Sequence, residues 1–383
     1  MSPRRRLVKI VTVPLSFQLG QGHAAVMTNA GFEVHAVSSP GPLADQYARY
    51  EKVPVHPVPM ARRIAPWADL VSFVRLYRTI RSLRPSVVQS GTPKAAVLGT
   101  LAAYLLRIRV RIYYVHGLPM LTAKGVLRRI LFAVERLTCR AATHIVCVSP
   151  SIRRELVLAG MCRPEKAVVL GHGSSNGIDM SVFDPARFPS DAVTRARANL
   201  GIPADALVIG FLGRIGREKG IEQLYEAWRT LREAFPTAYL LIVGPDEIND
   251  PVAPNVLEGL KTDSRVRMTG PDWYPAPLYA LMDVLCMPSH REGLPNVALE
   301  AAAMEVPVVA FRVPGVVDAV ESGTTGELVD PLSSAQIAAA IGKYFQQPSL
   351  RRMHGRAGRR RVHEFFAREK VWDALTKFYL SVN

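Results

Sequence analysis

The strongest constraint on the fold is a repeated alternation of short apolar runs with segments of helical period. Eleven runs of five to seven residues are rich in Val, Ile and Leu without polar alternation, which is typical of strands buried on both faces of a parallel sheet. These runs are residues 7–13, 32–38, 86–90, 110–116, 144–149, 167–171, 207–213, 238–244, 266–270, 283–289 and 306–311. Between them, apolar residues recur at helical spacing, as over residues 67–83 and 126–137. The pattern predicts an α/β protein.

The runs form two series, which predicts two doubly wound domains. Residues 173–190 separate the series and are rich in Gly, Ser, Pro and Asp, so they are predicted to be a hinge. We expect an N-terminal domain over residues 1–172 and a second domain over residues 191–350. The final basic segment, residues 351–383, is predicted to be helical and to return to the N-terminal domain.

Charge is distributed unevenly between these segments. The chain of 383 residues has a net charge of +16, with +18 in residues 1–172, −8 in residues 173–350 and +6 in residues 351–383. A basic first half followed by an acidic second half predicts two domains with different partners.

Composition excludes several classes of protein. With 49% hydrophobic and 21% charged residues, the chain is typical of a soluble globular protein. The longest uncharged apolar run, residues 95–106, is too short to span a bilayer, which takes about 20 residues, and no signal peptide is predicted. The four cysteines have no metal-binding spacing and are predicted to be buried thiols in a reducing cytoplasm.

Gly20, Gly22 and Ala25 match a dinucleotide-binding pattern after the first strand. That pattern needs an acidic residue at the end of the second strand to hold a ribose, and this chain has Ser38 and Ser39 there. We therefore expect these glycines to let the backbone approach a different ligand.

A second glycine-containing loop, residues 211–220, follows the first strand of the second series. Gly213 and Gly216 permit a tight turn, and Arg214 and Lys219 lie beside a predicted helix start. Two cations at a helix N-terminus are suited to a diphosphate, although a solvated loop with ordinary surface charges has the same pattern.

Glu292 and Glu300 flank a predicted strand-to-helix turn. Residues eight apart lie about 80° apart on a continuous helix, so the two carboxylates are predicted to contact different parts of one ligand rather than share a proton. Gly293 exposes backbone N–H groups at this helix start, where an anion is favoured. The spacing alone also occurs by chance.

His116 ends another predicted strand, a position where a lone histidine is usually structural. The chain contains no Asp-x-Asp sequence and no His, Asp and Glu cluster with metal-ligand spacing. No metal and no cofactor are therefore expected.

Several of these motifs, in this order, resemble glycosyltransferase family 4. In the second series they are "GRIGREKG", "LLIVGP", "HREGLPNVALEAAAMEVPVV" and "VPGVVDAVESGTTGELV"; in the first they are "VPLSF", "TPKAAVLG", "VHGLP" and "GHGSSNGID". The resemblance implies the GT-B fold, in which two Rossmann-like domains face a cleft, and sugar transfer with retention of anomeric configuration. The first series is similar to the bacterial branch that extends polyprenyl-diphosphate-linked glycans.

The resemblance also implies roles for matching residues. Glu292 and His116 would be catalytic, approaching the donor sugar. Arg214, Lys219 and the backbone of Gly293 and Leu294 would bind the donor diphosphate. Glu300 would bind the donor ribose, while Gly20 and Gly22 would lie on the acceptor side.

The basic first half contains two amphipathic helices, residues 67–85 and 124–140. Their arginines are either simply solvated or lie on an anionic membrane, where each cation contributes about 1 kcal/mol. No nucleic-acid-binding motif accompanies the basic charge. We expect a cytoplasmic protein, peripherally associated with the inner face of the cell membrane.

The sequence thus predicts a retaining, metal-independent hexosyltransferase. It would move a hexose or N-acetylhexosamine from a nucleotide sugar, a UDP-sugar, to a polyprenyl-diphosphate-linked acceptor. Two alternatives stay open: transfer to a small soluble acceptor, and a nucleotide-sugar epimerase of the same fold.

Overall fold

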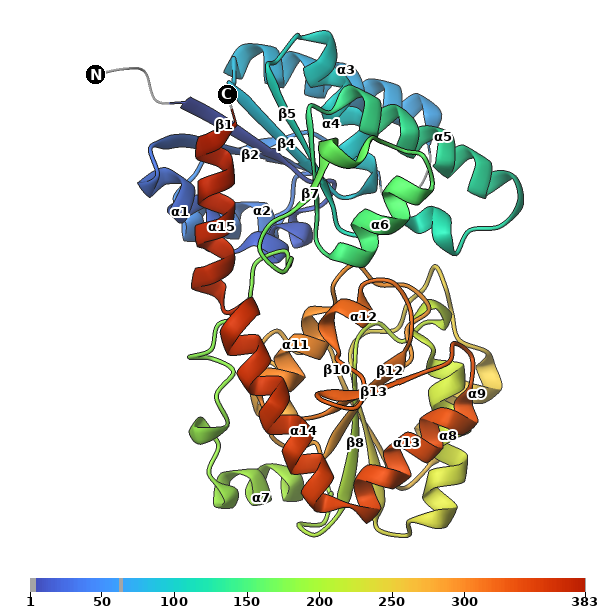
Figure 1. The fold of residues 1–383 in the computed structure, drawn as a ribbon. Coiled ribbons are helices and arrows are strands. Elements are labelled where there is room, and N and C mark those ends of the chain that lie inside the picture. Colours follow the sequence, from blue (N-terminus) through green and yellow to red (C-terminus); the bar gives the residue numbers. More distant parts are fainter. Residues whose placement is uncertain (1–4, 62–64, 383) are drawn as a thin grey trace. The chain divides into compact units, whose positions relative to one another are not determined.

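The computed structural model describes residues 5–61 and 65–382, which divide into two compact units. The first unit comprises Met1–Gly177 and Glu369–Asn383, and the second comprises Ile178–Arg368. Each unit is built around its own parallel sheet (Figure 1). The predicted α/β architecture with two parallel sheets is confirmed.

The first unit has a seven-stranded parallel sheet in the order β3-β2-β1-β4-β5-β6-β7. Its strands are β1 (Arg5–Ile10), β2 (Phe32–Ser38), β3 (Val55–Pro57), β4 (Val87–Gly91), β5 (Val110–Val115), β6 (His144–Cys147) and β7 (Ala167–Val169). Its longer helices are α1 (His23–Asn29), α2 (Pro42–Glu51), α3 (Pro66–Leu83), α4 (Pro93–Leu105), α5 (Gly125–Ala141), α6 (Pro150–Leu158) and α15 (Arg368–Ser381). A short 3₁₀ helix, Pro14–Gly20, precedes α1.

Helices cover both faces of this sheet, because the strands carry apolar side chains on both sides. On one face, Val8 and Ile10 of β1 pack with Leu76 and Ile80 of α3. On the other face, Phe32 of β2 contacts the fully buried Tyr379 of α15.

The second unit has a six-stranded parallel sheet in the order β10-β9-β8-β11-β12-β13. Its strands are β8 (Leu207–Leu212), β9 (Ala238–Val243), β10 (Val266–Gly270), β11 (Val284–Met287), β12 (Val308–Phe311) and β13 (Gly326–Val329). Its helices are α7 (Ser190–Asn199), α8 (Ile221–Ala234), α9 (Pro254–Thr262), α10 (Ala276–Tyr279), α11 (Asn296–Ala303), α12 (Val316–Ala319), α13 (Ser334–Gln346) and α14 (Pro348–Arg361). Gly210 of β8 leaves room for the Met282 side chain, whose Sδ a β-carbon there would overlap.

The unit boundaries differ from the predicted domain boundaries in two places. Residues 173–177 of the predicted hinge group with the first unit, whereas residues 178–190 group with the second, where Ile178 pairs with Ala367. Residues 351–368 also group with the second unit, because Gly355 and Gly358 let α14 pack closely on residues 302–305. Residues 369–383 group with the first unit.

Within the first unit, α15 is fixed by side-chain hydrogen bonds. The Tyr379 hydroxyl donates to Gln89 Oε1 of β4 at 2.6 Å, and Trp372 Nε1 donates to Asn176 Oδ1 at 2.8 Å. These contacts bring the end of the chain to the same face of the sheet as Gln89.

No helix among the described residues is long and apolar enough to cross a membrane.

Candidate functional site

The polar side chains of the second unit gather in the loops at the carboxyl ends of β8 and β11. The loop after β8 contains Arg214 and a 3₁₀ turn, Arg217–Lys219, and it ends at Gly220 with a φ of 73°. This left-handed conformation favours glycine, and a side chain on Gly220 would overlap the Pro288 carbonyl group. Glycine therefore allows the loop after β8 to meet the loop after β11.

The meeting of these loops brings Lys219 and Glu292 together. Lys219 Nζ donates to Glu292 Oε1 at 2.5 Å, and both side chains are mostly buried. An ion pair that is partly removed from water is stronger than an exposed one, so each side chain holds the other in position.

Two further cations in these loops are also paired. Arg214 Nη1 donates to Glu247 Oε2, in the loop after β9, and Arg291 Nε donates to Glu218 Oε1 at 2.6 Å. Arg214, Lys219 and Arg291 thus each have a carboxylate partner in the unliganded protein. A bound anion would have to compete with these carboxylates.

Glu300 has a different partner from Glu292. The Tyr279 hydroxyl of α10 donates to Glu300 Oε2 at 2.8 Å. Burial raises the pKa of Glu300 to about 7, and the hydrogen bond from Tyr279 partly opposes that rise. The Glu300 carboxyl is therefore expected to change its protonation state near neutral pH.

The segment between the two glutamates is closely packed. Leu294 is buried, and α11 begins at Asn296, directly after Pro295. Gly315, with a φ of 83°, lies against the Gly293 carbonyl oxygen, which a side chain there would overlap. The backbone around Gly293 is thus held by the turn before α12.

The first unit has an open pocket with a cavity volume of about 40 Å³ at the carboxyl ends of β1, β4 and β5. Gly20 and His116 both line it, together with Lys9 and His23. Gly22 does not line it. The Trp372 ring lies against Gly22, 2.7 Å from the position that a β-carbon there would take.

His116 is held in this pocket by its ring nitrogen Nδ1. Nδ1 lies 3.1 Å from Ser175 Oγ, and the ring stacks on Tyr114. Burial, with a contribution from the positive charge of Lys9, lowers the pKa of His116 to about 4. The imidazole is therefore neutral at neutral pH and able to exchange hydrogen bonds with uncharged groups.

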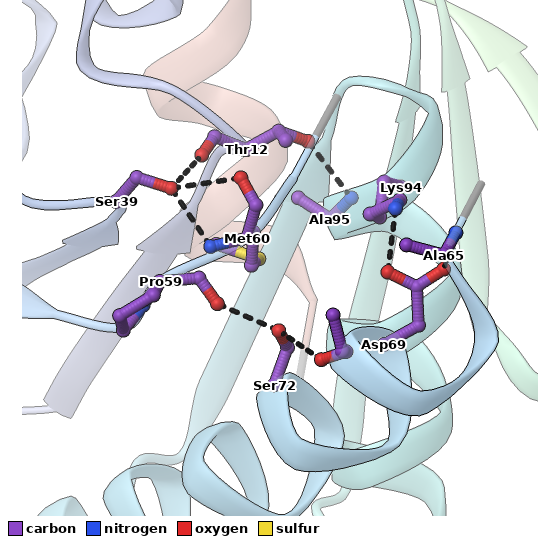
Figure 2. Close-up of polar contacts among 10 residues, drawn as sticks. Thr12, Ser39, Pro59, Met60, Ala65, Asp69, Ser72, Lys94 and Ala95 are labelled. Atoms are coloured by element: carbon purple, nitrogen blue, oxygen red, sulfur yellow. Dashed lines mark hydrogen bonds and ion pairs between the residues drawn. The ribbon is translucent and has the colours of Figure 1, made fainter. Parts of the chain in front are cut away.

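Hydrogen bonds fix the loops at the same edge of this sheet (Figure 2). Ser39 Oγ lies 2.8 Å from the Thr12 carbonyl oxygen and accepts from the Met60 N–H at 2.9 Å, which joins the ends of β1, β2 and β3. Lys94 Nζ, at the start of α4, donates to Asp69 Oδ1 of α3 at 2.5 Å. The edge that carries the pocket is therefore held by several independent contacts.

Residues 5–61 and 65–382 contain no group of three His, Cys, Asp or Glu side chains that could hold a metal ion.

Two family models match the chain. The model described as "Glycosyltransferase Family 4" matches residues 23–181, and the one described as "Glycosyl transferases group 1" matches residues 193–361. The capsular polysaccharide biosynthesis glycosyltransferase CapM of Staphylococcus aureus is 32% identical over 375 residues, which cover 98% of this chain and 97% of CapM. The chain belongs to glycosyltransferase family 4.

Two further proteins are similar to this glycosyltransferase at lower sequence identity. The UDP-Gal:alpha-D-GlcNAc-diphosphoundecaprenol alpha-1,3-galactosyltransferase of Escherichia coli is 24% identical over 298 residues, covering 76% of this chain and 74% of that protein. The structure of Anabaena Alr3699/HepE in complex with UDP-glucose aligns with a TM-score of 0.80 at 18% identity, over 98% and 99% of the two chains. The predicted GT-B fold is confirmed.

Sequence reasoning missed several residues of this glycosyltransferase's site. Tyr279 and Glu247 lie far in the sequence from Glu300 and Arg214, their respective partners, so only packing brings them together. Lys9 and His23 could not be identified from the sequence, because a single Lys does not break the apolar run of residues 7–13 and the burial of both side chains shows only in the structure.

Proposed function

We propose that this glycosyltransferase transfers a hexose or N-acetylhexosamine from a UDP-sugar to a polyprenyl-diphosphate-linked acceptor. The transfer proceeds with retention of anomeric configuration and without a metal ion, in the synthesis of a surface polysaccharide or another lipid-linked glycan.

The observation that carries the proposal is the Lys219–Glu292 pair, with Arg214 in the same loop and Glu300 on α11. When the bond between sugar and diphosphate breaks, negative charge grows on the leaving group. Cations already fixed beside that group lower the barrier. We assign Lys219 and Arg214 to the diphosphate, with the N–H groups of Gly293 and Leu294.

The two glutamates then bind the neutral parts of the donor. Glu292 leaves Lys219 to accept hydrogen bonds from sugar hydroxyls, and Glu300 accepts them from the ribose. In the first unit, neutral His116 approaches the sugar, and the segment of Gly20 and Gly22 borders the acceptor.

The comparisons support this choice of substrates. HepE was solved with UDP-glucose, and the E. coli relative is named for UDP-galactose and a diphosphoundecaprenol-linked sugar. CapM is named for capsular polysaccharide biosynthesis.

An exposed apolar surface in the first unit supports association with the cytoplasmic face of a membrane. Val126, Leu127 and Ile130 of α5 are exposed rather than packed on the sheet, with Val126 71% exposed. Arg128 and Arg129 lie in the same turns. Apolar side chains beside cations are typical of a helix that lies in the interface of an anionic bilayer.

A transfer assay with a panel of nucleotide sugars and a polyprenyl-diphosphate-linked N-acetylglucosamine tests the proposal. We expect one UDP-sugar to be consumed in the presence of a chelator, with an α-linked product from an α-linked donor. An inverted anomer would contradict retention, and activity restored only by a divalent ion would contradict metal independence. Transfer to soluble sugars alone, or an epimerised donor formed without acceptor, would support the alternative functions instead.

A further inference from the structure

A lysine is buried in the first unit at a position where the strand pattern calls for an apolar residue. Lys9 of β1 is 7% exposed, and it pairs in register with Gln89 of β4, so both side chains point to the face covered by α1 and α15. Removing an ammonium group from water is costly unless charge or hydrogen bonds replace the water.

The partners that Lys9 has do not fully compensate its charge. Its Nζ donates to His23 Nδ1 at 2.9 Å, and the described residues provide no ion pair for it. The Glu51 carboxylate is buried nearby, but its Oε1 accepts from the Gly22 N–H. Consistent with this, burial lowers the pKa of Lys9 to about 8, an effect that Glu51 only partly opposes.

His23 adds a second unused donor. Because Nδ1 accepts from Lys9, the neutral ring carries its proton on Nε2. His23 is 3% exposed, lines the same pocket as Lys9, and its Nε2 has no hydrogen-bond partner among the described residues. A buried donor without a partner costs stability, and this one lies beside an open pocket.

Two glycines leave nitrogen atoms of the pocket uncovered. A β-carbon on Gly20 would lie 3.4 Å from Lys9 Nζ, and one on Gly91 would lie 3.1 Å from His116 Nε2. Lys9, His23 and His116 therefore line one pocket from three different elements, with glycines beside Lys9 Nζ and His116 Nε2, where a side chain would cover them.

We propose that this pocket binds an oxyanion group of the acceptor, with Lys9 as its cation and His23 Nε2–H as a second donor. The inference rests on the proposed function, in which the first unit binds the acceptor. A phosphate of the lipid-linked diphosphate and a carboxylate of an acidic sugar share this chemistry, since both offer charged oxygens to N–H donors. A neutral sugar hydroxyl would leave the charge of Lys9 uncompensated.

Titration calorimetry with small probes tests the proposal. UDP is titrated first, and its failure to bind would count against the proposed function rather than this pocket. Inorganic pyrophosphate, D-glucuronate and D-glucose are then titrated into protein saturated with UDP, so that the cations of the second unit are occupied. We expect one of the two oxyanions to bind and glucose not to bind; the tighter oxyanion indicates the source.

Two variants remove the pocket in different ways. Lys9→Met removes the charge but keeps an apolar side chain of similar length. Gly20→Ala places a methyl group against the Lys9 amine, and Gly20 does not have the left-handed backbone conformation that would strain an alanine. We expect each to weaken oxyanion binding by about tenfold to a hundredfold, as for loss of a charge-assisted hydrogen bond. The exposed Lys261→Met in the second unit is the matched control and should bind as the wild type does.

Equal oxyanion affinity in wild type and Lys9→Met would overturn the proposal, as would equal binding of glucose or the absence of any oxyanion binding to the wild type. Thermal melting of both variants separates loss of the pocket from loss of the fold. If Lys9→Met does not fold, the oxyanion affinity of Gly20→Ala decides the test.

Discussion

The two units share an architecture but differ in their charge balance and in how their cations are paired. The first unit contains 27 Lys and Arg against 9 Asp and Glu, and the second contains 21 against 23. In the second unit, Lys219, Arg214 and Arg291 each have a carboxylate partner. Among the residues that the structure describes, Lys9 of the first unit has only a neutral imidazole as hydrogen-bond partner.

The difference shows how one fold supports two kinds of binding. Paired cations are held in place before the ligand arrives, but the ligand must replace the carboxylates. A buried cation without a direct ion pair costs stability, and a bound anion would supply that pair. We interpret the paired cations of the second unit as part of a donor site and the buried Lys9 of the first unit as part of an acceptor site.

The largest expected effect comes from removing a paired cation. Lys219→Met should lower the rate of sugar transfer by about 10²- to 10³-fold, because the leaving diphosphate loses a fixed positive charge. Initial rates of product formation measure the change, with Lys261→Met as the control. Near-normal turnover in Lys219→Met would contradict the donor-site assignment.

Removing the carboxylate of the same pair should separate binding from catalysis. Glu292→Gln should lower turnover by about a hundredfold, because a contact to the reacting sugar is lost. Affinity for UDP, which has no sugar, should stay the same or rise by about two- to tenfold, because Lys219 no longer has to leave a carboxylate. Calorimetry with UDP measures it. A fall in UDP affinity would show that the pair serves only to position Lys219.

The pKa of Glu300 predicts a pH-dependent affinity for the donor. The pKa is about 7, and in the proposed donor site the ribose hydroxyls donate to the ionised carboxylate. Affinity for UDP-glucose should therefore be complete above pH 7 and fall as the pH drops, by about tenfold one unit below the pKa. Glu300→Gln should remove this dependence, and Tyr279→Phe should move its midpoint upward. A wild-type affinity that is flat from pH 6 to 8 would exclude the ribose contact.

The smallest expected effect concerns the basic surface of the first unit. Val126→Asp should weaken flotation with anionic liposomes by about tenfold, because an exposed apolar contact is replaced by a charge that the bilayer repels. Leu158→Asp is a matched control, since Leu158 of α6 is 75% exposed. Equal flotation of both variants would place the membrane contact elsewhere.

The sequence predicted both sheets because their central strands are long, apolar runs. It missed β3 and β13, each of which is an edge strand of its sheet, and β3 is only partly buried. Arg214 and Lys219 could be predicted because glycine turns mark the loop that contains them. Glu247, the partner of Arg214, and Tyr279, the partner of Glu300, could not be predicted, since only tertiary packing brings each pair together.

The boundary of the final segment was also beyond sequence reasoning. Residues 351–361 and 369–381 were both predicted to be helical, and only Gly355, Gly358 and Tyr379 show which sheet each part contacts. Lys9 was read as part of a strand because one charged residue does not break an apolar run. Its burial, not its spacing, distinguishes it.

Titration of UDP into three proteins tests the contrast between the two units most directly. We expect Lys219→Met to bind UDP about tenfold to a hundredfold more weakly than wild type, from loss of a charge-assisted contact. Lys9→Met should bind UDP with wild-type affinity. If Lys9→Met lost as much UDP affinity as Lys219→Met, the assignment of donor and acceptor sites to separate units would be wrong.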